Sequence, residues 1–433
     1  MRERRPMFKT ILCCMLFSSL LFSQEWQHYT QANSGLPDDQ VNAIFVSLDG
    51  LIWLGTQEGL GVYNTHAWRQ FTESDGLSDN AIHDISYQSG DSAYSLWIAS
   101  DSGLTRLEVH SFEDIRIAET KTSANSGLLS DRVFCAAADT AEFHWFGTDR
   151  GVSLLADTAW IDITLDFLKD SLINDIAADT NGLMHIATEN GGLSRLKYNE
   201  VDGITSASTM IRPWSALPPR VYTVYIDSNN DQWFGTDEGV FKHIGLEHTS
   251  NWSLLSTTEG LVDNTVTSIE TDGRGGLWFG TPRGVSFYSK ETFENFTVSE
   301  GLISNTINDI AIDMPGNAWI ATDGGVSVYK RPTSVDNHRP LTHALSLTNY
   351  PNPFNAGTSI RFELQEPERI HLAIYNLAGE RLITLADRYQ QAGSQRIYWS
   401  GTDSEGFPLP SGVYFAVLTG KGLKLSQKLM LLK

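Results

Sequence analysis

The chain has 433 residues, a length typical of two or three domains, and its 41% hydrophobic and 19% charged residues are ordinary for a globular protein with a substantial core. The formal net charge of −21 argues against nucleic acid as a partner, because binding to phosphate backbones requires clustered cations. The 36 Gly, 12 Trp, 14 Tyr and 20 Phe favour β-structure with many tight turns.

Residues 1–23 have the pattern of a secretory signal peptide. An apolar run over residues 11–22 follows a basic start made of Arg2, Arg4, Arg5 and Lys9. This run is shorter than the roughly 20 residues that a membrane-spanning helix needs, so we expect cleavage and export, with an uncleaved anchor as the alternative. Removal of this segment leaves Cys135 as the single cysteine, which excludes an internal disulfide. Its apolar neighbours predict a buried, unreactive thiol.

The middle of the chain repeats one short pattern seven times. The pattern is an aromatic residue, an apolar residue, Gly or Ala, Thr or Ser, two further residues and Gly. Its copies begin at Trp53, Trp97, Trp145, His185, Trp233, Trp278 and Trp319, which are spaced 44, 48, 40, 48, 45 and 41 residues apart. A repeat of about 44 residues is typical of a β-propeller blade built from four short strands.

Further landmarks complete each repeat. Gly-Leu pairs at residues 35–36, 76–77, 260–261 and 301–302 precede apolar strands, and turn dipeptides such as Asp49-Gly50 and Asp272-Gly273 separate those strands from the aromatic ones. An outer-strand pattern occurs at residues 26–30, 68–72, 160–164, 252–256 and 293–297. The first copy precedes every repeat and the seventh repeat lacks one, so we expect residues 26–30 to complete the last blade and close the ring. Closure removes two open sheet edges.

This sequence pattern resembles the two-component-regulator propeller repeat. The resemblance rests on Gly-Leu-Pro at residues 35–37, Val-Asn-Ala-Ile at residues 41–44 and Ile-Trp-Leu-Gly-Thr at residues 52–56, and it extends over roughly residues 26–330. Such repeats are best known as periplasmic sensor domains of hybrid histidine kinases that respond to polysaccharides. Here nothing after the repeats resembles a membrane span or a kinase, so the resemblance implies ligand binding without signalling in cis.

The remainder of the chain predicts a second, smaller domain. A polar linker over residues 331–344 precedes six or seven short strands in residues 345–433, the pattern of an immunoglobulin-like β-sandwich. The segments Tyr-Pro-Asn-Pro-Phe-Asn at residues 350–355, Ser-Gly-Val-Tyr at residues 411–414 and the final Lys-Leu-Met-Leu-Leu-Lys resemble the type IX secretion C-terminal sorting domain, type A, itself similar to the Ig-like module of hook-capping proteins. The resemblance implies the type IX export machinery as a partner and a secreted or cell-surface location; a plain accessory domain is the alternative.

The overall prediction is therefore an all-β chain: a seven-bladed β-propeller over residues 25–330 followed by the small sandwich. The net charge is +3 in the signal segment and +2 in residues 345–433. The residues between them therefore carry −26, which brings the total to −21. Such a surface favours solubility and disfavours anionic membranes. We expect no membrane-spanning segment in the mature protein.

One rim of the propeller is the expected ligand site, because the loops before the inner strands and the Gly turns meet there. The candidate ligand-binding residues are amides, aromatics and two arginines able to hold a sugar by stacking and hydrogen bonds: Asn42, His83, Phe134, Arg150, Asn174, Tyr222, Arg283 and Asn308. The alternative is that the asparagines cap turns and the aromatics fill the centre of the ring.

Three functions remain open on the sequence. The first is a secreted or cell-surface protein that binds an extracellular polysaccharide or other ligand. The second is a propeller lyase or hydrolase that uses His83 or rim acids, and the third is an adhesive or structural scaffold that binds other proteins. No catalytic set, metal-ligand spacing or cofactor motif stands out, so we expect a binding protein rather than an enzyme, with no catalytic residues, no metal and no cofactor.

Overall fold

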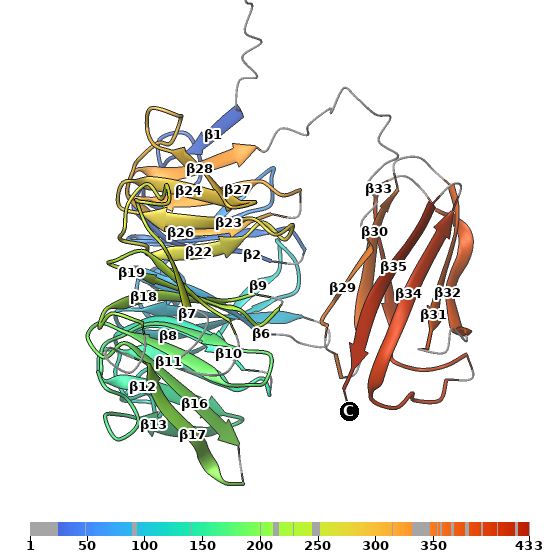
Figure 1. The fold of residues 1–433 in the computed structure, drawn as a ribbon, viewed down its shortest axis with the longest axis horizontal. Helices are drawn as coiled ribbons and strands as arrows, with labels where there is room; N and C mark the ends of the chain where they lie inside the picture. Colours follow the sequence, from blue (N-terminus) through green and yellow to red (C-terminus); the bar gives the residue numbers. More distant parts are fainter. Residues whose placement is uncertain are drawn as a thin grey trace, which may run out of the picture. The chain divides into compact units, whose positions relative to one another are not determined.

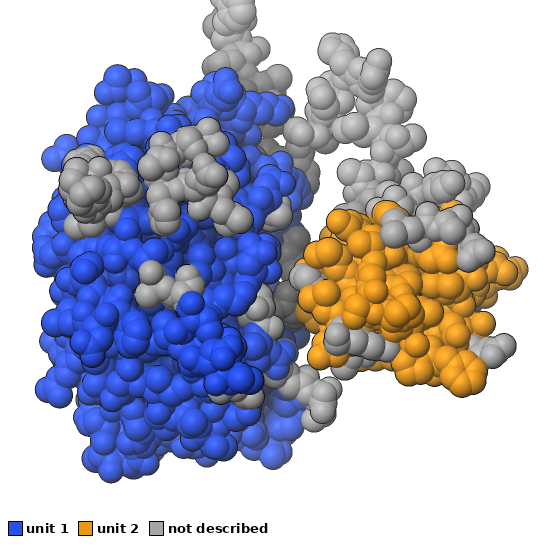
Figure 2. All heavy atoms as spheres, turned by 60° about the horizontal axis from the view of Figure 1, so that its bottom comes forward, with its two compact units in different colours: residues 1–332 blue, residues 333–433 orange. Residues whose placement is uncertain are grey.

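The computed structural model describes residues 25–432 except 48, 89–92, 140, 200, 211–215, 228, 245–251, 314, 331–346, 353, 356, 365–367, 377–380, 391–392, 405 and 421–422. The expected signal peptide and the linker over residues 331–344 lie outside the described residues. The chain forms two compact units, Met1–Pro332 and Thr333–Lys433, which Figure 2 colours separately.

Unit 1 is built from seven antiparallel sheets of four strands each, and Figure 1 labels many of these strands. Apart from the 3₁₀ turn Glu73–Asp75, its described secondary structure is all β. Blade 1 consists of β2 (Val41–Val46), β3 (Ile52–Thr56), β4 (Gly59–Tyr63) and β5 (Trp68–Phe71). Blade 2 consists of β6 (Ile82–Gln88), β7 (Tyr94–Ser100), β8 (Gly103–Val109) and β9 (Ile115–Lys121). Blade 3 consists of β10 (Val133–Ala138), β11 (His144–Thr148), β12 (Gly151–Ala156) and β13 (Ala159–Ile163). Blade 4 consists of β14 (Ile173–Ala178), β15 (Met184–Thr188), β16 (Leu193–Asn199) and β17 (Gly203–Met210). Blade 5 consists of β18 (Val221–Ile226), β19 (Gln232–Thr236), β20 (Val240–His243) and β21 (Trp252–Leu255). Blade 6 consists of β22 (Ser268–Thr271), β23 (Leu277–Thr281), β24 (Gly284–Ser289) and β25 (Thr292–Phe296).

Blade 7 joins the two ends of the unit. Its strands are β26 (Ile307–Ile312), β27 (Ala318–Thr322), β28 (Gly325–Lys330) and β1 (Glu25–Tyr29), and β1 pairs antiparallel with β28 from Glu25 opposite Lys330 to Tyr29 opposite Val326. The first strands of consecutive blades contact one another around the whole series, and β26 contacts β2. The sheets therefore form a closed ring, and the predicted seven-bladed propeller is confirmed.

The repeated motif lies at the centre of each sheet. All residues of the second strands β3, β11, β15, β19, β23 and β27 are buried. The Thr or Ser at the end of each second strand donates its hydroxyl to the carbonyl of the turn glycine, as Thr56 does to Gly59 at 2.7 Å. Gly59 has φ +137°, and a Cβ there would lie 2.7 Å from the carbonyl oxygen of Phe71, so the turn requires glycine.

Each blade packs against the next through apolar side chains. Trp53 and Val62 of blade 1 pack in one cluster with Leu96 and Leu107 of blade 2. Trp319 of blade 7 belongs to a similar cluster with residues of blade 1, so the same packing closes the ring. Burial of a large aromatic at each junction contributes about 150–250 Å² of contact area, which explains the spacing of the tryptophans.

Unit 2 is a sandwich of two antiparallel sheets, which confirms the predicted immunoglobulin-like class. One sheet has the order β29 (Leu347–Tyr350), β30 (Thr358–Leu364), β33 (Gly393–Trp399); the other has the order β32 (Arg381–Gln390), β31 (Glu368–Tyr375), β34 (Gly412–Gly420), β35 (Leu423–Leu431). Trp399, Phe354 and Tyr414 are buried in its core. Asn352 accepts a hydrogen bond from the backbone N–H of Met430 at 2.7 Å and donates to the carbonyl of Lys428 at 2.9 Å. The Tyr-Pro-Asn-Pro-Phe-Asn segment therefore holds the last strand.

Candidate functional site: the mouth of the propeller channel

The second residue of each inner-strand repeat lies at one mouth of the central channel. The predicted residues Asn42, His83, Phe134, Asn174, Tyr222 and Asn308 occupy this position in blades 1, 2, 3, 4, 5 and 7, and Thr267 occupies it in blade 6. We call these seven residues the mouth ring.

The amide and hydroxyl members of the mouth ring join neighbouring blades. Asn42 donates to the carbonyl of Ile82 at 2.9 Å, Asn174 to that of Val221 at 2.9 Å, Asn308 to that of Val41 at 2.8 Å and Thr267 to that of Ile307 at 3.1 Å. Each acceptor is the first residue of the next inner strand, so the three asparagines have a structural function between blades. Turn capping was the alternative considered for them, and the described bonds instead clasp one blade to the next.

The aromatic members of the mouth ring stand beside ion pairs. The guanidinium of Arg132 lies 5.5 Å from the ring centre of Phe134 and forms an ion pair with Asp101 at 3.2 Å. The guanidinium of Arg220 lies 6.0 Å from the ring of Tyr222 and forms a 2.7 Å ion pair with Glu189.

His83 shares the carboxylate of Asp101. The Nε2 atom of His83 lies 3.1 Å from Asp101 Oδ1, and its ring centre lies 5.6 Å from that of Phe134. The imidazole and the Arg132 guanidinium both lower the pKa of the Asp101 carboxyl, against the effect of partial burial. Asp101 is therefore held ionised.

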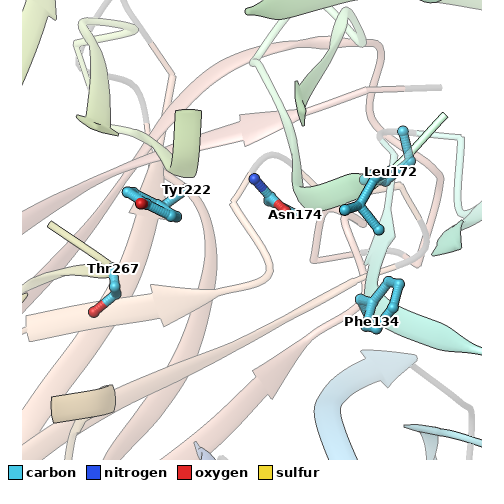
Figure 3. Close-up of a pocket in the computed structure, with 6 residues that line it drawn as sticks. Phe134, Leu172, Asn174, Tyr222 and Thr267 are labelled. Atoms are coloured by element: carbon cyan, nitrogen blue, oxygen red, sulfur yellow. The ribbon is translucent and has the colours of Figure 1, made fainter. Parts of the chain in front are cut away.

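A pocket of about 340 Å³ opens at one side of the mouth ring. It is lined by Phe134, Leu172, Ile173, Asn174, Tyr222 and Thr267, and Figure 3 shows Asn174 between Tyr222 and Leu172. Its volume lies at the small end of the roughly 300–1,000 Å³ range of small-molecule sites. Asn174 donates its amide hydrogens to the carbonyl of Val221 and to Glu189 Oε2 at 3.2 Å, and its oxygen has no donor among the described residues, so that oxygen can accept a bond from a ligand.

The structure brings together only part of the predicted site. Phe134, Asn174 and Tyr222 line the pocket, whereas Asn42, His83 and Asn308 lie elsewhere on the mouth ring. The two predicted arginines are exposed and do not line it: Arg283 forms a 3.2 Å ion pair with Asp263, and Arg150 lies in the Gly turn of blade 3. Leu172, Arg132 and Arg220 were not predicted, although each immediately precedes an inner strand and an alignment of the repeats reveals that shared position.

A row of carboxylates lies one residue further along the inner strands. Asp84, Asp175 and Asp309 accept backbone N–H bonds from Ala136, Val224 and Ile44, each on a neighbouring blade, at 2.7, 2.8 and 2.8 Å. Burial raises the pKa of Asp84 to about 7 and that of Asp309 to about 6, and mutual repulsion adds to the effect. Burial also raises the pKa of Asp175. We call these three the carboxylate clasps.

Cys135 occupies the same register position in blade 3. It is buried, and its desolvation, together with the Asp175 and Asp84 carboxylates, raises the pKa of its thiol well above the ordinary value. The unreactive thiol expected from the sequence agrees with this environment.

The rim acids considered as catalysts have structural partners. Asp79, Asp131 and Asp263 accept backbone N–H bonds from Ala81, Ser123 and Thr265 within their loops at 2.9, 2.6 and 2.8 Å. Within the described part of the chain, no three His, Cys, Asp or Glu side chains are arranged to hold a metal ion. Its helices, likewise, include none that is long and apolar enough to cross a membrane.

The fold and two matches to family models define an exported propeller protein. Residues 260–283 and 301–324 match the two-component regulator propeller model, and residues 348–432 match the secretion system C-terminal sorting domain. The chain thus carries both modules expected from its sequence, the propeller repeats and the C-terminal sorting domain, and the sorting domain directs it to the cell surface by type IX secretion. No curated protein matches the sequence.

Several solved structures share the fold. PorZ, an essential surface component of the type-IX secretion system of Porphyromonas gingivalis, is 17% identical with a TM-score of 0.57, over 92% of this chain and 60% of that one. The extracellular domain of a hybrid two component system from B. thetaiotaomicron is 17% identical with a TM-score of 0.58, over 94% and 57%. This chain therefore spans about 60% or less of these proteins. Virginiamycin B lyase from Staphylococcus aureus is 12% identical with a TM-score of 0.52, over 70% and 98%. A surface component of a secretion system, the extracellular domain of a two component system and a lyase share this architecture, so the fold alone does not decide between a binding protein and an enzyme.

Proposed function

We propose that the protein is a non-enzymatic, extracellular binding protein that takes an oligosaccharide or polysaccharide end into the pocket at the channel mouth. The observation that carries this proposal is the pairing of two aromatic rings, Phe134 and Tyr222, with the free acceptor oxygen of Asn174 around one small cavity. Sugar rings present an apolar face and a rim of hydroxyl groups, and this lining complements both. The extracellular sensor propellers with which the chain shares its fold are consistent with such a role.

The test is binding of the full mature chain to an array of extracellular oligosaccharides, followed by titration calorimetry. We expect saturable binding that Phe134→Ala and Tyr222→Ala each weaken at least tenfold, because aromatic contacts in a pocket dominate such affinities. Tyr389→Ala removes an exposed aromatic of unit 2 and is the matched control. Capture of partner proteins without any sugar binding would instead favour the scaffold function.

One observation favours a second candidate, a lyase or hydrolase. The imidazole of His83 stands 3.1 Å from a carboxylate, an arrangement in which a histidine can act as a general base. Product analysis on the same sugars separates the candidates: turnover that is lost in His83→Ala would establish the enzyme, and binding without turnover would exclude it for those sugars.

A further inference from the structure

The acid that begins the Gly turn has the same two kinds of partner in blades 2 and 4. One partner is the mouth-ring residue of its own blade, and the other immediately precedes the inner strand of the next blade. Asp101 pairs with His83 at 3.1 Å and Arg132 at 3.2 Å. Glu189 accepts from Asn174 at 3.2 Å and pairs with Arg220 at 2.7 Å.

Blade 7 keeps the first of these partners. Asp323 accepts a 2.9 Å hydrogen bond from Asn308 of its own blade. In all three blades the first residue of the inner strand pairs with the residue just before the acid, for example Ile307 with Thr322. This register therefore places the turn acid next to the mouth-ring side chain.

Blade 3 has the acid but neither partner. Val133 pairs with Thr148, so the same register places Asp149 next to Phe134, and the position of the second partner is taken by Leu172. Neither side chain can donate a hydrogen bond. The Oδ1 atom of Asp149 is buried and has no hydrogen-bond partner among the described residues. A buried carboxylate oxygen without a donor is unfavourable, which makes it a ready acceptor for a group that a ligand brings.

The two residues that replace these partners are also walls of the pocket. Phe134 and Leu172 line the cavity, and the strand register places Asp149, which is not itself a lining residue, next to Phe134. Arg132 and Arg220, which lie over the rings of Phe134 and Tyr222, form ion pairs with Asp101 and Glu189. Asp149 thus offers an oxygen without a hydrogen-bond partner among the described residues, beside an aromatic face that attracts cations.

The wider electrostatics favour the same ligand charge. The formal net charge of the chain is −21. Such a field concentrates cations and repels anions.

We propose that the pocket binds a glycan that carries a free amino sugar, with Asp149 as the counter-ion of the ammonium group, and that it rejects acidic glycans. The proposal rests on the proposed function and names its ligand class. The sugar ring lies against Phe134 or Tyr222, and the ammonium group donates to Asp149. An N-acetylated sugar lacks the charge, and a uronate is repelled.

The experiment compares three hexasaccharides by titration calorimetry on the full mature chain at pH 5.5: glucosamine, N-acetylglucosamine and galacturonic acid. We expect the glucosamine hexamer to bind at least tenfold more tightly than the acetylated one and the galacturonate hexamer not to bind. Asp149→Asn should remove the preference for glucosamine. Glu58→Gln removes an exposed acid from the equivalent turn of blade 1 and should leave all three affinities unchanged.

The outcomes separate this proposal from the one on which it rests. Equal binding of the acetylated and free hexamers, sensitive to Phe134→Ala but not to Asp149→Asn, would refute the amino-sugar assignment and support glycan binding. If the Asp149→Asn variant still prefers glucosamine, the preference comes from the net negative charge of the protein, and the role of Asp149 is refuted. Absence of binding to all three hexamers refutes the amino-sugar proposal, and absence of binding across the wider array refutes both.

Discussion

The carboxylate clasps predict that acidification stabilises the propeller. Burial raises the pKa of Asp84 to about 7 and of Asp309 to about 6, from an ordinary value of 3.8. The folded protein therefore holds more protons on these groups than the unfolded chain does between pH 4 and 7. Stability must then fall as pH rises through the folded pKa values, the opposite of the behaviour of salt-bridged carboxylates.

The size of the effect follows from these two pKa values. Between pH 7.5 and pH 5, a carboxyl with a folded pKa of about 7 contributes roughly 2.5 kcal/mol to the change in unfolding free energy, and one at about 6 contributes roughly 1.4 kcal/mol. Both residues keep some exposed area, so part of this is screened by water. We expect a net gain in unfolding free energy of about 2–4 kcal/mol on acidification.

Equilibrium urea unfolding followed by tryptophan fluorescence measures this gain, because a tryptophan is buried at most blade junctions. The double variant Asp84→Asn, Asp309→Asn removes two of the buried titrating groups and should reduce the pH dependence, whereas Asp175 and Glu270, whose pKa values burial also raises, remain in both proteins. The acidic surface also gains stability on acidification, and this contribution remains in the variant, so the difference between the two proteins isolates the clasps. The reasoning fails if the wild-type protein becomes less stable from pH 7.5 to pH 5, or if both proteins show the same slope.

Three further predictions concern closure, the thiol and the last strand. Trp26→Ala, which removes the ring that packs 5.0 Å from Tyr329, should lower the unfolding free energy of the propeller by about 2–4 kcal/mol in the same urea assay; no change would mean that β1 does not hold the ring. Cys135 should resist alkylation by iodoacetamide in the native protein and react fully in urea, and rapid native labelling would contradict its burial. Asn352→Ala should make the C-terminal strand more sensitive to carboxypeptidase, at a cost of about 1–3 kcal/mol, because it leaves the N–H of Met430 without its partner; unchanged digestion would show that the strand is held by its ladder alone.

Much of the fold could be predicted because the same kinds of residue recur at the same place in every repeat. Seven aromatic or histidine positions at an even period place the second strand of every blade, and the missing outer strand after the seventh repeat points to the first residues of the mature chain. Glycines such as Gly59 could be located because their backbone conformation tolerates no side chain. These features are local in sequence, and each recurs in several copies.

The composition of the candidate site could be predicted only in part. The mouth-ring positions follow from the register of the inner strands, so Phe134, Asn174 and Tyr222 could be named in advance. Which of the seven positions surround a cavity depends on what the neighbouring blade supplies. An alignment of the repeats therefore shows the position of Leu172 but not that this side chain lines a pocket. Arg150 shows the same limit: it was named from its place in the Gly turn, but it is exposed and does not line the pocket.

The mouth ring explains why the pocket lies where it does. Wherever a mouth-ring residue is an amide, or the hydroxyl of Thr267, it bonds the next blade and contributes to closure of the ring. Phe134 and Tyr222 form no such bond, and the pocket lies across the blades that hold them. A repeat protein must conserve the bonds between its units if the ring is to remain closed, so a ligand site is most readily accommodated at units that have exchanged those bonds for other chemistry. In blade 3 this exchange leaves Asp149 without the donors that Asp101 and Glu189 have in blades 2 and 4. The proposed ligand class therefore follows from the blade that departs from the repeat and not from the blades that keep it.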